Sequence, residues 1–191
     1  MKELLMGSDA EVSIASLIGR CIILLVLVIW GFRLIFSSVD SNYAGTSFMH
    51  LINLPFHEAG HILFRLFGRF MTVLGGSLLQ VLIPLICLGT FLIKTRDPFA
   101  GAVAFWWTGE SLLDLAPYIN DARALRLILL GGVTGQDVDD YHDWEYILGH
   151  LGLLTWDHFL ATTAHLFGSI IMITACVWGG LVLWRQFRSA S

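Results

Sequence analysis

Residues 54–68 read LPFHEAGHILFRLFG, which places two histidines and a glutamate inside a run that is otherwise strongly apolar. An ionisable side chain in an apolar segment is costly unless it is paired, hydrogen-bonded or bound to a metal. The fold must therefore supply partners for His57, Glu58 and His61 in the interior of the protein.

The composition of the whole chain indicates a membrane protein. Of its 191 residues, 56% are hydrophobic and only 14% are charged, and the mean hydropathy is +0.74. Soluble domains usually have about a quarter of their residues charged. The length fits a single membrane domain over residues 1–191. A net charge of −4 offers no basic patch for nucleic acid. The hydrophobic composition makes the lipid bilayer the expected environment.

Apolar runs divide the chain into a predicted bundle of about five transmembrane helices. Several runs approach or exceed the roughly 20 residues that a helix needs to cross a bilayer. The predicted spans cover residues 16–36, 48–67, 78–93, 99–119 and 158–184, with loop and short-helix material over 120–157. Five crossings would put the two chain ends on opposite sides of the membrane. The predicted fold class is thus all-α, a polytopic membrane helix bundle.

The segment after the second span, residues 68–77, reads GRFMTVLGGS. It combines β-branched residues with glycines, so we expect a short extended β segment or a loop here. The third span would begin only after this segment, with Pro84 as a kink inside it.

His57, Glu58 and His61 form the pattern H-E-x-x-H within a predicted helix. Residues at i and i+4 share one helical face, so both imidazoles can reach a single ion. Neutral imidazole suits Zn²⁺, and a catalytic zinc site keeps an open position for water. We therefore predict one zinc ion held by His57 and His61, with Glu58 as the general base toward the water. Hydrogen bonding between helices by the same side chains is the alternative.

A zinc site usually has three protein ligands, so a third must come from elsewhere in the chain. Asp121 ends the fourth span, which runs in the same direction as the second, so it comes to a similar depth as the histidines. Asp114 lies two helical turns earlier, so it is an alternative ligand or a residue that shapes the water path. Capping of the segment that follows is the alternative role for Asp121. His142 and Asp143 can ligate the ion or orient a ligand by hydrogen bonding.

Three more residues stand out near the motif. Gly60, between the two histidines, lets a neighbouring helix or a substrate come close, or reflects ordinary packing of small residues. His50 lies seven residues before His57 and nearly on the same helical face, as an interfacial residue or a support for the site. Gln80 hydrogen-bonds either a substrate or a neighbouring helix.

Several segments together resemble the site-2 protease family of intramembrane zinc metallopeptidases, most of all its small bacterial members. They are FHEAGH at 56–61, GGSLLQVLIPL at 75–85 and SLLDLAPYINDARAL at 111–125. In that family the third zinc ligand is the aspartate of a later motif, N-x-x-P-x-x-x-L-D-G. The resemblance implies this role for Asp121, although Asn120 and Ala122 stand here in place of the family's leucine and glycine.

The resemblance also implies a function and a location. It implies a multi-pass protein of the bacterial inner membrane that hydrolyses a peptide bond in or near a transmembrane segment of a substrate protein. It further implies extended strands beside the site, where an extended peptide could pair. The alternative is a non-catalytic membrane protein that binds a metal or a partner protein.

Overall fold

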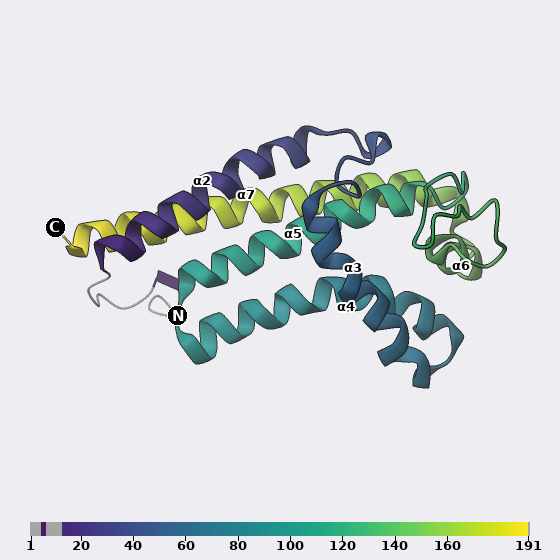
Figure 1. The fold of residues 1–191 in the computed structure, drawn as a ribbon, viewed down its shortest axis with the longest axis horizontal. Coiled ribbons are helices and arrows are strands. Elements are labelled where there is room, and N and C mark those ends of the chain that lie inside the picture. Colours follow the sequence, from purple (N-terminus) through teal and green to yellow (C-terminus); the bar gives the residue numbers. More distant parts are fainter. Residues whose placement is uncertain (1–4, 7–12, 191) are drawn as a thin grey trace.

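The computed structural model describes residues 5–6 and 13–190, and within them the regular elements are all helical. Figure 1 shows long helices running side by side, with short helices and loops toward one end. The long helices are α2 (Ile14–Phe36), α4 (Arg69–Thr90), α5 (Pro98–Asn120) and α7 (Asp157–Ala190). The short helices are α3 (Phe48–Leu63) and α6 (Asp143–His150). Single turns cover Val39–Ser41, Phe64–Phe67, Phe91–Thr95 and Leu154–Trp156.

Three of the described helical segments are long and apolar enough to cross a bilayer: residues 14–36, 69–95 and 154–189. The prediction of an all-helical protein with membrane-spanning helices is confirmed at this level, with three candidate spans in place of about five. α3 has only 16 residues, fewer than the roughly 20 that a crossing needs. α5 is long enough, but it carries Glu110 and Asp114 in its buried part.

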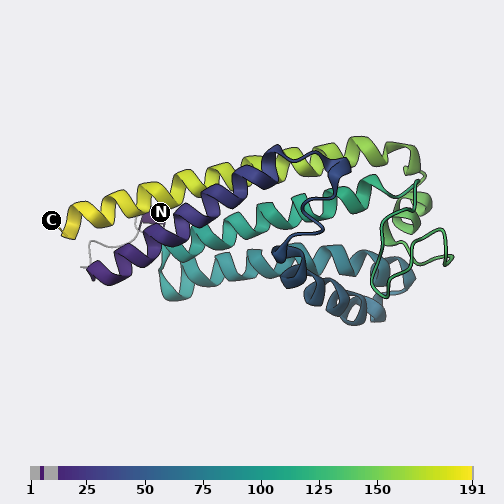
Figure 2. The same ribbon diagram turned by 45° about the horizontal axis from the view of Figure 1, so that its top comes forward.

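The predicted second span is in fact one arm of a helical hairpin. After α3 and one turn, Gly68 adopts a left-handed φ of +89°, which reverses the chain into α4. Figure 2 shows α3 lying beside the first half of α4. α2 begins and α7 ends at the same end of the bundle (Figure 1). This arrangement differs from the one expected for five crossings, which would place the two chain ends on opposite sides of the membrane.

The expectation of an extended segment or loop at residues 68–77 is wrong, because residues 69–77 form the first turns of α4. The glycines there serve a close crossing of two helices. A Cβ atom on Gly60 would overlap the carbonyl group of Gly75, and one on Gly75 would come within 2.7 Å of the Gly60 carbonyl oxygen. Small residues at such a crossing let two membrane helices approach to backbone contact.

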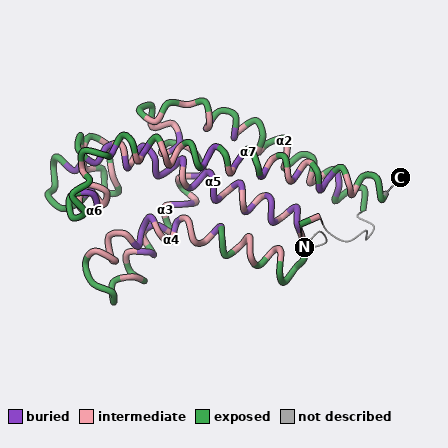
Figure 3. The backbone as a smooth tube through the Cα atoms, turned by 180° about the vertical axis from the view of Figure 1, so that it is seen from behind, coloured by how far each residue is buried: buried purple, intermediate pink, exposed green. Residues whose placement is uncertain are grey.

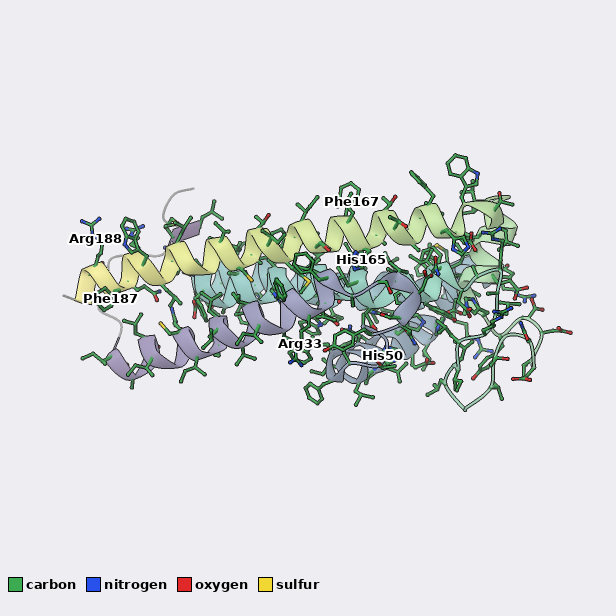
Figure 4. The ribbon with its side chains drawn as sticks, turned by 90° about the horizontal axis from the view of Figure 1, so that it is seen from above. Arg33, His50, His165, Phe167, Phe187 and Arg188 are labelled. Atoms are coloured by element: carbon green, nitrogen blue, oxygen red, sulfur yellow. The ribbon has the colours of Figure 1, made fainter. Side chains whose placement is uncertain are left out.

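α5 forms the centre of the bundle, and α7 packs along it. Figure 3 shows buried positions along most of α5, while the outer faces of α2 and α7 are exposed. Large apolar side chains cover those outer faces, among them Ile22, Phe32, Ile173 and Leu181. Phe167 and Phe187 project outward from α7 in the same way (Figure 4). An outer surface this apolar fits contact with lipid better than contact with water.

Candidate metal centre

The two histidines of the motif lie on α3, where α4 passes directly behind them. A Cβ atom on Gly76 of α4 would lie 2.6 Å from the Nε2 atoms of both His57 and His61. The backbone of Gly76 thus forms the wall of the site, and the missing side chain gives the two imidazoles their space. The close helix crossing at Gly60 depends on Gly75, and the space for the imidazoles depends on Gly76. These two glycines are consecutive residues of α4.

A carboxylate from a distant part of the chain meets this pair. Oδ2 of Asp143 lies 2.9 Å from Nε2 of His57 and 3.3 Å from Nε2 of His61. One ligand atom from each of the three residues lies within 4.8 Å of the others. The His57 residue is only 8% exposed, so the cluster is largely shielded from solvent.

The other ring nitrogens show which atoms are free to bind. Nδ1 of His57 lies 3.0 Å from Oε1 of Gln80, and Nδ1 of His61 lies 2.9 Å from the carbonyl oxygen of Thr72. A carbonyl oxygen can only accept, so each Nδ1 carries a proton and donates it. In the neutral rings, both Nε2 lone pairs then face the carboxylate of Asp143. A positive charge among these atoms makes the convergence favourable. A second proton on an imidazole can supply it, or a metal ion, and the donor set of two imidazoles and one carboxylate fits Zn²⁺.

Asp143 reaches the site because it is the first residue of α6. Nδ1 of His142 caps this helix by accepting from the backbone N–H of Glu145, at 3.2 Å. The backbone N–H of Asp143 donates to the hydroxyl oxygen of Tyr118, on α5, at 2.9 Å. Burial raises the pKa of the Asp143 carboxyl, but when the imidazoles of His57 and His61 also carry a proton on Nε2, their hydrogen bonds outweigh burial and hold this pKa below its usual value.

Asp121, the predicted third ligand, lies at the end of α5 and serves another purpose. Its two carboxylate oxygens accept the backbone N–H groups of Arg126 and Leu127, at 3.0 and 2.9 Å. Asp143, and not Asp121, is the carboxylate that lies beside the two histidines among the described residues. The family motif and the expected depth of the fourth span favoured Asp121, whereas the chain folds back after α5 and brings the start of α6 to the histidines.

His142 does not belong to the His57–His61–Asp143 cluster either. Its side chain is fully buried, and burial lowers its pKa despite the nearby carboxyls of Asp121 and Asp143. A neutral ring is what the α6 cap requires, because Nδ1 must accept there. Nε2 lies 3.4 Å from Oδ2 of Asp121. His142 thus supports the position of Asp143 through the start of the helix.

Asp114 lies beside the site and is hydrogen-bonded to its supporting residues. Its Oδ2 atom accepts from Nε2 of Gln80 at 2.9 Å and from Nδ2 of Asn53 at 3.0 Å, while Oδ1 lies 2.9 Å from Nδ1 of His50. His50, at the start of α3, is labelled in Figure 4. Sequence reasoning named Gln80 as a contact to a neighbouring helix or a substrate, and the residue it meets is His57.

A cavity of about 580 Å³ opens over the cluster. Glu58, His57, His61 and Asp143 lie on its wall, and residues 127–132 of the loop after α5 cover another side. No hydrogen bond to another described residue holds the Glu58 carboxylate. It is therefore free to act on a molecule in the cavity, next to the predicted metal ligands.

Comparisons with known protein families, with curated proteins and with solved structures give no match. The function of the site has to be inferred from its own chemistry.

Proposed function

We propose that this protein is a zinc-dependent intramembrane protease in which His57, His61 and Asp143 hold one zinc ion and Glu58 is the general base. The observation that carries the proposal is the convergence of two imidazole Nε2 atoms and one carboxylate beside an unengaged glutamate in a cavity. The H-E-x-x-H spacing on α3 is what sets Glu58 next to the two ligands.

Three protein ligands leave a fourth position of a zinc ion open, as a hydrolytic site requires. When bound, the ion lowers the pKa of a water molecule and polarises a peptide carbonyl group. With the ion bound, Glu58 would accept a proton from the attacking water and would deliver it to the amide nitrogen as the C–N bond breaks. His57, His61 and Asp143 keep the reacting groups in place during this exchange.

The surroundings of the site support a protein substrate that lies in the membrane. The outer faces of α2 and α7 are apolar, so the cavity belongs to a protein surrounded by lipid. Cavity walls formed by Leu127 and Leu129 on one side and by Glu58 and Asp143 on another suit an apolar peptide segment with a polar backbone. The location that fits this function, and the family resemblance, is a bacterial inner membrane.

The direct test uses purified protein in lipid vesicles with a panel of single-span membrane proteins as substrates. We expect about one zinc ion per chain and cleavage that a chelator stops. Glu58→Gln should retain the zinc and lose cleavage, because only the base is removed. Zinc binding without cleavage of any panel member would favour a non-catalytic metal-binding protein, and an absence of zinc would overturn both functions.

A further inference from the structure

We infer that Gln80 and Asp114 are positioning residues for the metal centre, which hold the His57 imidazole with its Nε2 atom toward Asp143. The inference rests on the proposed function, since it describes how one zinc ligand is oriented. It assigns a role to a buried hydrogen-bond chain that the hydrolysis itself does not use.

The hydrogen-bond chain has one donor-to-acceptor direction because Asp114, as a carboxylate, can only accept. Its Oδ2 atom therefore faces the amide NH₂ group of Gln80, at 2.9 Å, so the amide oxygen of Gln80 points the other way. That oxygen lies 3.0 Å from Nδ1 of His57, which must then be the protonated nitrogen. Asp114 thus determines, through Gln80, which nitrogen of His57 is left for the metal.

Asp114, where this hydrogen-bond chain begins, is itself held in place by hydrogen bonds. Nδ2 of Asn53 donates to Asp114 and also to Oε2 of Glu110, at 3.0 and 2.9 Å. Oδ1 of Asn53 accepts from Nε1 of Trp107 at 2.8 Å. Asn53, Gln80 and Asp114 are all buried, with exposed fractions of 1%, 3% and 6%. Because water has little access to replace a lost partner, each bond in the chain constrains the next one.

The second ligand is oriented in a different way. Nδ1 of His61 meets the backbone carbonyl oxygen of Thr72, which no side-chain substitution removes. The orientation of His57 depends on a side chain, and that of His61 on the path of α4. A substitution at Gln80 should therefore disturb one of the two imidazoles and leave the other in place.

The test combines one substitution with two measurements. Gln80→Met keeps an unbranched side chain of similar size and removes the strong acceptor, so the helix packing is preserved. We expect zinc affinity, measured by competition with a chelator, to fall about 10- to 100-fold. The visible absorption bands of bound Co²⁺ should change as well, because one imidazole is no longer held in its direction.

Two further variants separate positioning from packing. Gln80→Glu combined with Asp114→Asn keeps an acceptor for His57 and an N–H donor facing residue 80, and should restore most of the affinity. Ser77→Ala lies on the same helix, at a buried hydroxyl without a hydrogen-bond partner, and should leave affinity and spectrum unchanged. If Gln80→Met binds Zn²⁺ as tightly as the native protein and gives the same Co²⁺ spectrum, the inference is wrong while the proposed function stands.

A measurement on the native protein needs no substitution. The ¹⁵N chemical shifts of His57 in the metal-free protein should show a proton on Nδ1 and none on Nε2 at a pH where the ring is neutral. A proton on Nε2 and none on Nδ1 would overturn the inference. A native protein that binds no zinc at all would overturn the proposed function, and the imidazole shifts would still decide the role of Gln80.

Discussion

The two halves of the candidate metal centre are built in different ways. The α3–α4 hairpin supplies His57 and His61, and it depends on short-range sequence features: a one-turn spacing of ligands and glycines at a helix crossing. The connection between α5 and α6 supplies Asp143, and it depends on polar contacts across residues 118–145. The difference shows that a motif can define half of a site while the other half is set by how a loop folds.

The largest effect is expected from Gly76→Ala, which acts on the hairpin half. The new Cβ atom would lie 2.6 Å from both Nε2 atoms, so the imidazoles must move away from their positions. Because side-chain ends move more easily than backbone, we expect the fold to survive and zinc binding to be lost, by at least about 100-fold. Elemental analysis of the purified variant measures this.

Gly89→Ala is the matched control on the same helix. A Cβ atom on Gly89 meets nothing within 4 Å, so zinc content should remain that of the native protein. Full zinc content in Gly76→Ala would show that the ion does not lie between these two imidazoles.

The loop half is tested by comparing Asp143→Asn with Asp121→Asn. Removing the negative charge from a ligand should lower zinc affinity by about 100-fold, whereas Asp121 binds backbone N–H groups and lies beside His142, so it should matter much less. Affinities from chelator competition give the comparison. If Asp121→Asn lowered zinc affinity more than Asp143→Asn, then Asp121 and not Asp143 would be the third zinc ligand.

A moderate effect on stability is expected from Gly60→Ala. The added methyl group would overlap the backbone of Gly75, which cannot rotate away as a side chain can. The cost should be about 1–3 kcal/mol, as for other overpacked contacts. Unfolding in detergent measures it, with Gly19→Ala as the control, because a Cβ atom there meets nothing within 4 Å. Equal stability of the two variants would mean that the helices do not cross so closely.

The smallest effect is expected from Arg69→Ala. The Arg69 guanidinium lies 3.0 Å from Oδ1 of Asp140 and covers the ring of Tyr146, so it links the start of α4 to the segment that carries Asp143. Both charged side chains are well exposed, and such pairs contribute little. Zinc affinity should change by less than about threefold. A larger loss would show that this surface contact holds the two halves of the site together.

Several features could be predicted from the sequence because they depend on local pattern. The apolar runs indicated membrane-spanning helices, and the H-E-x-x-H spacing placed two histidines on one face of α3. Gly75 and Gly76 led to the wrong prediction of an extended segment or loop, because glycine is frequent both in turns and at close helix crossings. The crossing partner, Gly60, lies in another helix, and nothing in residues 68–77 themselves indicates it.

The carboxylate that lies beside the two histidines could not be chosen from sequence spacing. Asp121 and Asp143 both follow α5. Asp121 lies beside His142 and accepts a backbone N–H group, and Asp143 lies beside His57. Only the return of the chain after α5, with Tyr118 holding the backbone of Asp143, decides between them. Asp143 was among the candidates because it adjoins His142 in a polar segment, and that was the only signal for it.

The central claim is that His57, His61 and Asp143 bind a single zinc ion, and X-ray absorption at the zinc edge tests it most directly. We expect about one ion per chain, with two imidazole nitrogens at about 2.0–2.1 Å and oxygen ligands completing the shell. The nitrogen signal should weaken in a His61→Ala variant. Purified protein that retains no zinc, or a zinc ion without imidazole ligands, would contradict the claim.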